Sequence, residues 1–274
     1  MGKVLIAMSG GVDSSVAAYL LKHSGWDCVG ATMTLYRNED IGISRSRTCC
    51  SLEDVEDARS VAFRLRIPYY VFNFSDEFRR QVMDRFADAY GQGRTPNPCI
   101  DCNRYLKFRH LYDRAALLGC DTIATGHYAR IERENGRYLL KKALGASKDQ
   151  SYVLYMLTQE QLAHTRFPLG TLHKTEAREL AGRLGFFNAR KPDSQDICFV
   201  PDGDYAAFIR RHTGKADALG DFVDESGRIL GRHKGIAHYT IGQRKGLGIP
   251  SNRLLYVKAI DPKSNQVVLS GNDA

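Results

Sequence analysis

Two glycines, one aspartate and three serines follow an apolar run near the N-terminus, in the segment SGGVDSS from Ser9 to Ser15. Glycines let backbone N–H groups approach an anion closely, and a helix N-terminus adds positive potential. Asp13 among such donors suits a magnesium ion on a pyrophosphate. The segment contains no lysine, and the common phosphate-loop pattern GxxxxGK[ST] is absent from the chain. The segment indicates a site for nucleotide phosphates; the alternative is a glycine-rich turn with a Ser/Asp helix cap.

A second group with chemical potential is the CxxC pair Cys99 and Cys102, in the segment RTPNPCIDCN. Its prolines favour an extended loop, and Asn103 is expected to cap the helix that follows. Cys102 would then lie beside a helix N-terminus, which stabilises a thiolate. Three interpretations stay open: nucleophilic or redox thiols, ligands of a metal or iron–sulfur site, or coincidence, because no second CxxC supplies further ligands.

The other cysteines differ in their surroundings. Cys198 stands in KPDSQDICFV, and by itself it would be a buried core residue, but the polar run before it is unusual for a structural strand. Cys28 and Cys120 lie in apolar, strand-like stretches and are expected to be core residues. Cys49 and Cys50 have no assigned role. The odd total of seven cysteines argues against a disulfide framework.

Strands and helices that would position these residues alternate along the chain. Strands are expected at residues 3–8, 27–35, 69–74 and 120–126, and helices at 12–23, 51–65, 75–90, 103–118 and 173–185. Such alternation predicts an α/β fold with a doubly wound parallel sheet covered on both faces. SGGVDSS then lies at the carboxyl end of the first strand, where open α/β sheets bind ligands.

The pattern changes towards the C-terminus. Asn135-Gly136 between two alternating runs predicts a β-hairpin. From about Gly214 the chain becomes rich in short strands and turns, which indicates a small β domain. We therefore expect one domain over residues 1–208 and a β-rich domain over residues 209–274.

Composition adds supporting observations. The 274 residues carry a net charge of +8, which suits a polyanion such as RNA, although a solvated basic surface is the alternative. No apolar run is long enough to cross a bilayer, and the N-terminus does not resemble a signal peptide. A cytoplasmic location is expected, with no membrane partner.

Taken together, the motifs resemble those of the tRNA-specific 2-thiouridylases, a family of the PP-loop N-type ATP pyrophosphatase superfamily. The resemblance extends from Lys3 to about Gly271. The motifs follow in the family's order: SGGVDSS, GRTPNPCIDCN, TGHYAR, KDQSYVL, HKTEAR, SQDICF and YTIGQRKGLG. The first is shared with the superfamily, whereas TPNPxxxCN, KDQSYxL and SQDICF are specific to the family.

The resemblance implies a role for individual residues. ATP would contact Ala7, Met8, Ser9, Gly10, Gly11, Val12, Asp13, Ser14, Met33 and Gly126, with Asp13 on magnesium and pyrophosphate. Cys102 would be the nucleophile and Cys198 would carry a persulfide. The anticodon arm of tRNA would contact Asn97, Pro98, Cys99, Lys148, Asp149 and Gln150. Many family members have aspartate, a candidate general base, at the position of Cys99.

The implied activity is ATP-dependent 2-thiolation of the wobble uridine of tRNA, with sulfur from a cysteine desulfurase or a relay protein. Three alternatives remain. Cys99, Cys102 and Cys198 could instead hold an iron–sulfur cluster, such as [4Fe-4S], with a site open to sulfide. The chain could be another PP-loop enzyme that does not depend on Cys198, or a non-catalytic tRNA-binding module. The family's C-terminal β-barrel is expected to be largely absent.

Overall fold

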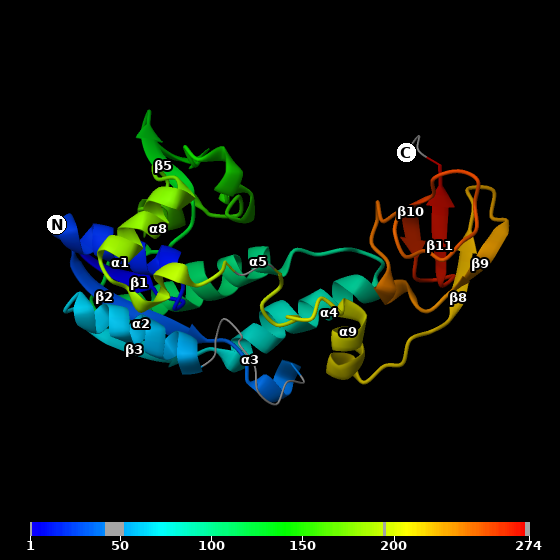
Figure 1. Cartoon of the computed structure of the whole chain (residues 1–274), viewed down its shortest axis with the longest axis horizontal. Coiled ribbons are helices and arrows are strands. Elements are labelled where there is room, and N and C mark those ends of the chain that lie inside the picture. The colour runs from blue at the N-terminus through cyan, green and yellow to red at the C-terminus, as the bar shows by residue number, and fades with distance from the viewer. Residues whose placement is uncertain (1, 42–51, 194–195, 272–274) are drawn as a thin grey trace.

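The computed structural model describes residues 2–41, 52–193 and 196–271, so Cys49 and Cys50 lie outside the described residues. A five-stranded parallel sheet forms one part of the molecule, and a four-stranded sheet near the C-terminus forms another (Figure 1). The helix α4 and the helix α9 lie between the two sheets in this view. None of the described helices is both long and apolar enough to traverse a lipid bilayer.

The parallel sheet has the order β3-β2-β1-β4-β7. Its strands are β1 (Lys3–Ala7), β2 (Asp27–Thr34), β3 (Tyr69–Asn73), β4 (Thr122–Ala124) and β7 (Thr165–Arg166). All neighbours pair in parallel, with Leu5 opposite both Val29 and Ile123. Because β1 lies between β2 and β4, the loop after β1 stands where the strand order reverses, which is the usual ligand position in such sheets. The predicted fold class is confirmed.

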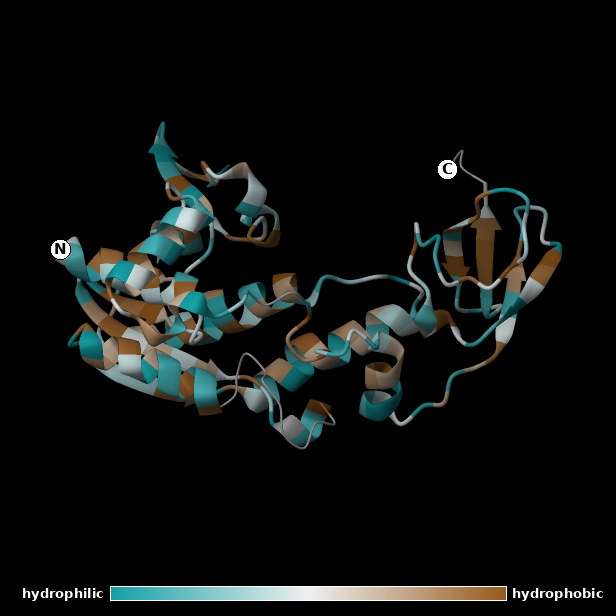
Figure 2. Ribbon diagram, viewed as in Figure 1, coloured by the Kyte–Doolittle hydropathy of each residue, from teal (hydrophilic) through white to brown (hydrophobic). Residues whose placement is uncertain are grey.

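Two apolar cores cover the two faces of this sheet. The main helices are α1 (Val12–His23), α2 (Leu52–Arg64), α3 (Ser75–Phe78), α4 (Asp84–Gly91), α5 (Pro98–Asp101), α6 (Leu111–Leu117), α7 (Gln159–Ala163), α8 (Lys174–Arg183) and α9 (Tyr205–Thr213). Val4 and Ile6 pack towards α1, α2 and α8, whereas Leu5 packs towards α3, α4 and α6. This alternation follows from the two-residue period of a strand. Figure 2 shows the brown apolar residues gathered along these elements.

Two long helices differ from the sequence prediction. The helix expected over 75–90 contains a π-helical segment, η2 (Arg79–Met83), between α3 and α4. The helix expected over 103–118 begins earlier, at Pro98, and runs as α5, the π-helix η3 (Cys102–His110) and α6. Proline fits the first position of a helix because its fixed φ and missing N–H cost nothing there. π-helical turns are rare and occur often at functional sites.

The remaining strands form a hairpin and a second, four-stranded sheet. The predicted hairpin at Asn135-Gly136 is present, as β5 (Ala129–Glu134) and β6 (Arg137–Lys142), and both turn residues have positive φ. The second sheet has the order β10-β11-β8-β9, with strands β8 (Gly220–Val223), β9 (Ile229–His233), β10 (Tyr256–Asp261) and β11 (Gln266–Ser270). It encloses a separate apolar core that includes Phe222, Val257 and Leu269.

The remaining short helices are η1 (Asn38–Ile41), η4 (Ala146–Lys148), η5 (Ser151–Val153), η6 (Phe187–Arg190) and η7 (Ile236–His238).

Candidate functional site

The loop between β1 and α1 depends on glycine. Gly10 has a φ of +75°, and a Cβ atom there would lie 2.4 Å from the carbonyl oxygen of Asp54. Gly11 is the N-cap of α1, and it makes no side-chain cap hydrogen bond. No capping side chain therefore competes for the first-turn N–H groups of this 12-residue helix, which suits them to an anion.

Hydrogen bonds from two serines of the motif and from the distant Asn188 stabilise the loop. The hydroxyls of Ser14 and Ser15 each donate to the carbonyl oxygen of Gly11 at 3.0 Å. The amide Nδ2 of Asn188 donates to the carbonyl oxygen of Gly10 at 2.8 Å and to the Ser15 hydroxyl at 2.9 Å. Asn188 is buried in η6, so a segment far along the chain fixes the shape of the loop.

Gly126 is needed because the end of β4 meets the beginning of α1. A Cβ atom at Gly126 would lie 2.8 Å from the carbonyl carbon of Asp13 and from the amide nitrogen of Ser14. Any larger side chain there would push the β4 end away from the loop. The predicted loop residues and Gly126 therefore do meet in space.

Asp13, the predicted magnesium ligand, lies in a network of charged and polar groups. The ammonium group of Lys174 lies 2.7 Å from each of its carboxylate oxygens, and the hydroxyl of Tyr128 donates to Oδ1 at 2.8 Å. Burial, together with the charge of Asp13, raises the pKa of Tyr128, so Tyr128 stays a hydrogen-bond donor at neutral pH. Asp13 thus contacts one cationic side chain and one hydroxyl donor.

Asp193 is the second carboxylate of this network. It contacts Lys174 at 2.8 Å, Arg178 at 2.7 Å and Lys148 at 3.0 Å. Burial acts to raise its pKa, but the hydrogen bonds and charges of Lys174 and Lys148 outweigh burial and set the pKa at about 2. Lys174 therefore bridges two carboxylates, Asp13 and Asp193, beside the loop.

Of the three predicted tRNA-contacting residues at 148–150, two hold the local backbone. Asp149 accepts hydrogen bonds from the amide nitrogen of Ala143 and the hydroxyl of Ser151, at 2.9 and 2.7 Å. The side-chain oxygen of Gln150 accepts from the amide nitrogen of Tyr128 at 3.0 Å. Lys148 has a half-exposed side chain and, through Asp193, connects this segment to the phosphate loop.

Asn97 and Pro98, rather than Asn103, begin the helix that carries Cys99 and Cys102. The side chain of Asn97 accepts from the amide nitrogen of Cys99 at 3.0 Å, as an N-cap does. The prediction that Asn103 caps the helix is wrong: Asn103 is buried, and its Nδ2 donates to the carbonyl oxygen of Val153. The field of a helix N-terminus weakens beyond the first turn, so it acts on Cys99 more than on Cys102.

Cys102 and Cys198 pack against the same apolar core, on the α4–α6 face of the parallel sheet. Both are partly buried, whereas Cys99 is exposed and Cys28 and Cys120 are buried as predicted. The hydroxyl of Tyr36 donates to the carbonyl oxygen of Cys198 at 2.7 Å, which anchors the turn that carries it. Folding has therefore brought two cysteines that are 96 residues apart onto one core.

The three cysteines of the alternative iron–sulfur site, all of them in the described part of the chain, are not grouped as metal ligands. Within residues 2–41, 52–193 and 196–271, no three His, Cys, Asp or Glu side chains are grouped so that they could hold a metal ion. Cys99, Cys102 and Cys198 belong to these ranges, and the reason is local: Cys99 is exposed at the helix start, while the other two pack on the core.

The other predicted nucleotide contacts lie at the carboxyl ends of neighbouring strands. Ala7 ends β1, Met8 is buried directly after it, and Val12 is buried at the start of α1. Met33 lies near the end of β2 and is partly buried. Because parallel strands end at one edge of the sheet, these residues surround the same edge as the loop.

Sequence reasoning missed four residues of this site: Tyr128, Lys174, Asn188 and Asp193. Tyr128 and Lys174 stand in TGHYAR and HKTEAR, two motifs that carried the family resemblance, and Asp193 begins the polar run before Cys198. Their place in those motifs is a usable signal. Asn188 has no such signal, because its contact with Gly10 exists only in the folded chain.

Fold and loop together define a class: an α/β protein of the PP-loop type, with a glycine-rich loop at the point where the strand order reverses. A family model described as the tRNA methyl transferase HUP domain matches residues 2–202. A second model, described as the tRNA methyl transferase PRC-barrel domain, matches residues 206–271.

Sequence comparison with curated relatives identifies the family within this class. The tRNA-specific 2-thiouridylase MnmA of Lachnoclostridium phytofermentans is 55% identical over all of this chain and 77% of the relative. The protein of the same name from Clostridioides difficile is 53% identical over 99% of this chain and 75% of the relative. The chain therefore belongs to the family of tRNA-specific 2-thiouridylases, as the motifs predicted.

Two solved structures are similar to this chain at lower identity. A 4-thiouridine synthetase, solved as an RNA complex with bound ATP, is 23% identical with a TM-score of 0.48, over 73% of this chain and 45% of that chain. The NMN synthetase of Francisella tularensis is 17% identical with a TM-score of 0.44, over 79% of both chains.

Proposed function

We propose that this chain, a member of an enzyme family that thiolates tRNA, replaces the C2 oxygen of the wobble uridine by sulfur at the expense of ATP. The observation that carries the proposal is the packing of Cys102 and Cys198 on one core, on a sheet whose carboxyl edge carries the phosphate loop. The loop would hold the triphosphate, and the two cysteines would deliver sulfur.

The reaction balances in two stages. The C2 oxygen of uracil attacks the α-phosphorus of ATP, and pyrophosphate leaves. The terminal sulfur of a Cys198 persulfide then attacks C2, and AMP leaves with the former oxygen. The Cys102 thiolate attacks Sγ of Cys198, which frees the 2-thiouridine and leaves a Cys102–Cys198 disulfide. An external dithiol would reduce that disulfide, and a protein donor, a cysteine desulfurase or a relay protein, would renew the persulfide.

Each part of the site has a task in this scheme. The α1 N-terminus and the loop serines stabilise the negative charge of the leaving pyrophosphate. Lys174 balances Asp13 and Asp193, which would otherwise repel the triphosphate. Tyr36 holds the turn that positions Cys198. Lys148 and the start of the helix at Asn97–Cys99 would contact the anticodon arm of tRNA. Because the substrate is tRNA, we expect the reaction to take place in the cytoplasm.

Magnesium fits the acidic groups of this site. Asp13 and Asp193 both lie within 2.8 Å of the Lys174 ammonium group, so the two carboxylates stand together beside the loop. Magnesium ions in nucleotide sites commonly take one or two carboxylates together with phosphate oxygens. Asp13, and next to it Asp193, would hold the ion, which would neutralise charge on the phosphates.

The test measures two products with one set of variants. Cys198→Ala should abolish 2-thiouridine in a tRNA transcript supplied with ATP and a persulfide donor, while pyrophosphate release persists. Asp13→Asn should lose both. Cys120→Ala, a change at a buried cysteine of the core, should keep both if its melting temperature is preserved. Undiminished 2-thiouridine from Cys198→Ala would contradict the proposal and favour another PP-loop chemistry.

One further measurement separates the remaining alternatives. Protein purified without oxygen should contain no stoichiometric iron or acid-labile sulfide and should show no visible absorption band. A bound cluster, with activity lost on chelation, would favour the iron–sulfur route. Binding of tRNA without any pyrophosphate release from the wild-type chain would instead identify a non-catalytic binding module.

A further inference from the structure

A hollow of about 450 Å³ lies beside the helix that carries Cys102. Its walls come from η3 and from the segment around the start of α7: Arg104, Tyr105, Arg109, Tyr155, Met156, Thr158 and Gln161. None of these residues belongs to the predicted nucleotide or cysteine site. The lining contains two arginines, two tyrosines and no carboxylate.

The π-helical turn brings the two arginines to one face. Arg104 and Arg109 are five positions apart, which in an α-helix of 3.6 residues per turn would place them about 140° apart. In η3 the hydrogen bonds connect residues five apart, as shown at its end by the bond from Leu111 to the carbonyl oxygen of Leu106. Residues five apart are then neighbours along the helix, so both guanidinium groups reach the same hollow.

The other wall is fixed in place. Thr158 and Gln161 form a capping box at the start of α7, and Nε2 of Gln161 donates to the carbonyl oxygen of Phe108 at 2.9 Å. This bond connects α7 directly to η3. The hollow is therefore formed before any ligand arrives, as is usual for binding pockets.

Within the described ranges, the two arginines of the hollow are not held in ion pairs, although Asp101 lies near enough to Arg104 to interact with its charge. Neither Arg104 nor Arg109 makes an ion pair with any carboxylate of the described residues. Their positive charges are therefore left to attract an anion from outside.

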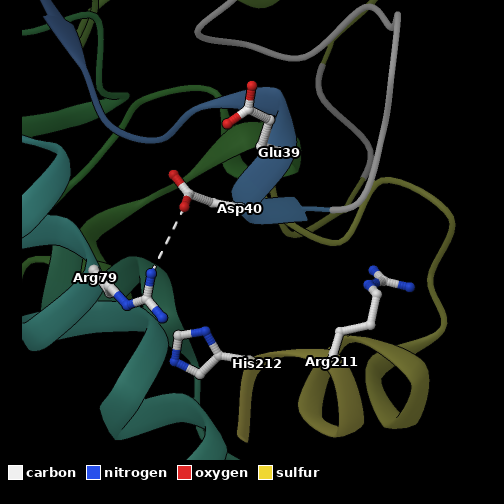
Figure 3. A pocket seen from close by; sticks show the side chains of 5 residues that line it. All are labelled: Glu39, Asp40, Arg79, Arg211 and His212. Atoms are coloured by element: carbon white, nitrogen blue, oxygen red, sulfur yellow. Dashed lines mark ion pairs between the residues drawn. The ribbon is translucent and has the colours of Figure 1, made fainter. Parts of the chain in front are cut away.

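A second hollow, of about 190 Å³, differs from the first in that its basic side chains have partners within the protein. Figure 3 draws its lining, with Asp40 and Arg79 facing each other, and these groups are 3.7 Å apart. Arg211 donates to the carbonyl oxygen of Ile41, and His212 lies 2.6 Å from Asp84. The basic side chains of that hollow already have partners inside the protein.

Aromatic side chains complete the first hollow. Tyr155 is 66% exposed. The guanidinium of Arg104 lies 5.9 Å from the centre of the Tyr105 ring, and Arg85 lies 5.2 Å from the same centre. Exposed aromatic rings beside arginines are the combination on which single-stranded nucleic acids stack their bases while their phosphates are neutralised.

We propose that this hollow binds a nucleotide of the RNA substrate that neighbours the one to be modified, with its base on Tyr155 and its phosphates on Arg104 and Arg109. The inference rests on the proposed function, since it supplies a second contact for the same tRNA. Arg104 is two residues after Cys102 on one helix. RNA held in the hollow is therefore held close to Cys102, the proposed nucleophile.

The experiment measures binding of a hairpin RNA with a loop uridine as a function of salt. Tyr155→Ala should weaken binding about 5- to 100-fold, the range for loss of one stacked base, whereas Tyr155→Phe should bind within about twofold of wild type. Arg104→Ala and Arg109→Ala should each reduce the slope of log affinity against log salt by about 1. Arg183→Ala removes an exposed arginine from the last turn of α8 and should change neither quantity.

Each other outcome overturns the proposal. If Tyr155→Ala and both arginine variants bind the hairpin as wild type does, the hollow is not an RNA site, although the proposed function stands. If polyglutamate displaces a fluorophore-labelled hairpin from wild type but not from Arg104→Ala, the hollow takes an acidic polypeptide instead. If wild type binds no hairpin and forms no 2-thiouridine, the proposed function fails as well. Cys198→Ala should still bind the hairpin, which separates binding from sulfur transfer.

Discussion

Lys174 and Asp13 are 161 residues apart, yet the ammonium group lies 2.7 Å from both carboxylate oxygens. Lys174 also contacts Asp193 at 2.8 Å, and its side chain is only 12% exposed. The phosphate loop SGGVDSS lacks the lysine of the common phosphate-binding pattern, and the start of α8 supplies one from elsewhere in the chain. This lysine neutralises two carboxylates at the position where a triphosphate would bind.

Removal of that ammonium should weaken nucleotide use. In Lys174→Ala, Asp13 would lose its ion pair beside the triphosphate, whereas Asp193 would keep Lys148 and Arg178. The rate of pyrophosphate release should therefore fall at least about tenfold, or about 1.4 kcal/mol. Pyrophosphate release at a fixed ATP concentration measures the effect.

A matched control for this prediction is Lys141→Ala. Lys141 also lies between two carboxylates, Glu132 and Glu134, but on the exposed β5–β6 hairpin. Its loss should leave pyrophosphate release unchanged. Equal activity in Lys174→Ala and wild type would show that the bridge between Asp13 and Asp193 has no part in nucleotide binding.

Gly126→Ala should destabilise the protein and distort the loop. The added Cβ atom would lie 2.8 Å from backbone atoms of Asp13 and Ser14, so the end of β4 must shift, at a cost of about 1–3 kcal/mol. Gly182→Ala is the opposite case. Gly182 lies in α8 with no atom within 4 Å of an added Cβ, and alanine there should stabilise by about 0.5–1 kcal/mol. Urea unfolding measures the free energy of unfolding of both variants and wild type. Equal changes in the two variants would show that the close approach of Gly126 to α1 does not matter for stability.

Asp193 should make folding stability depend on pH in the acid range. Its pKa is about 2 in the folded protein against an ordinary 3.8, because the cations around it favour the charged form despite burial. The resulting stabilisation, about 2 kcal/mol, is present above pH 4 and is lost as pH falls towards 2. The stability gap between wild type and Asp193→Asn should therefore shrink over that range. Asp113→Asn, at an exposed helix position, is the matched control for a carboxylate outside this network.

The five cysteines of the described residues should react with iodoacetamide in a fixed order. Burial raises the pKa of Cys28 to about 11, and burial also raises the pKa of Cys120. At pH 8 only about a thousandth of Cys28 is thiolate, and its side chain is 1% exposed. Cys99 should be labelled first, Cys102 and Cys198 next, and Cys28 and Cys120 only in denaturant. Peptide mass mapping over time measures the order, and early labelling of Cys28 would contradict its burial.

Local patterns in the sequence determined much of this protein. Periodicity of two and of about 3.6 residues predicted β1, α1 and β2 nearly to the residue, because apolar side chains must face a core on one side. The Asn135-Gly136 pair predicted its hairpin, because both positions need positive φ. Motifs of fixed spacing predicted the family, which the relatives confirm.

Tertiary structure alone decided which distant groups meet. Local patterns carry no information about contacts between residues such as Lys174 and Asp13, or Asn188 and Gly10, because these depend on how α8 and η6 pack on the sheet. The same holds for the helix start at Asn97. There, Asn97 is the N-cap and Pro98 occupies the first helical position. Asn103 is buried instead, and its side chain contacts Val153. The π-helical segment η3, which brings Arg104 and Arg109 together, was likewise not predicted, since sequence periodicity indicates an ordinary α-helix there.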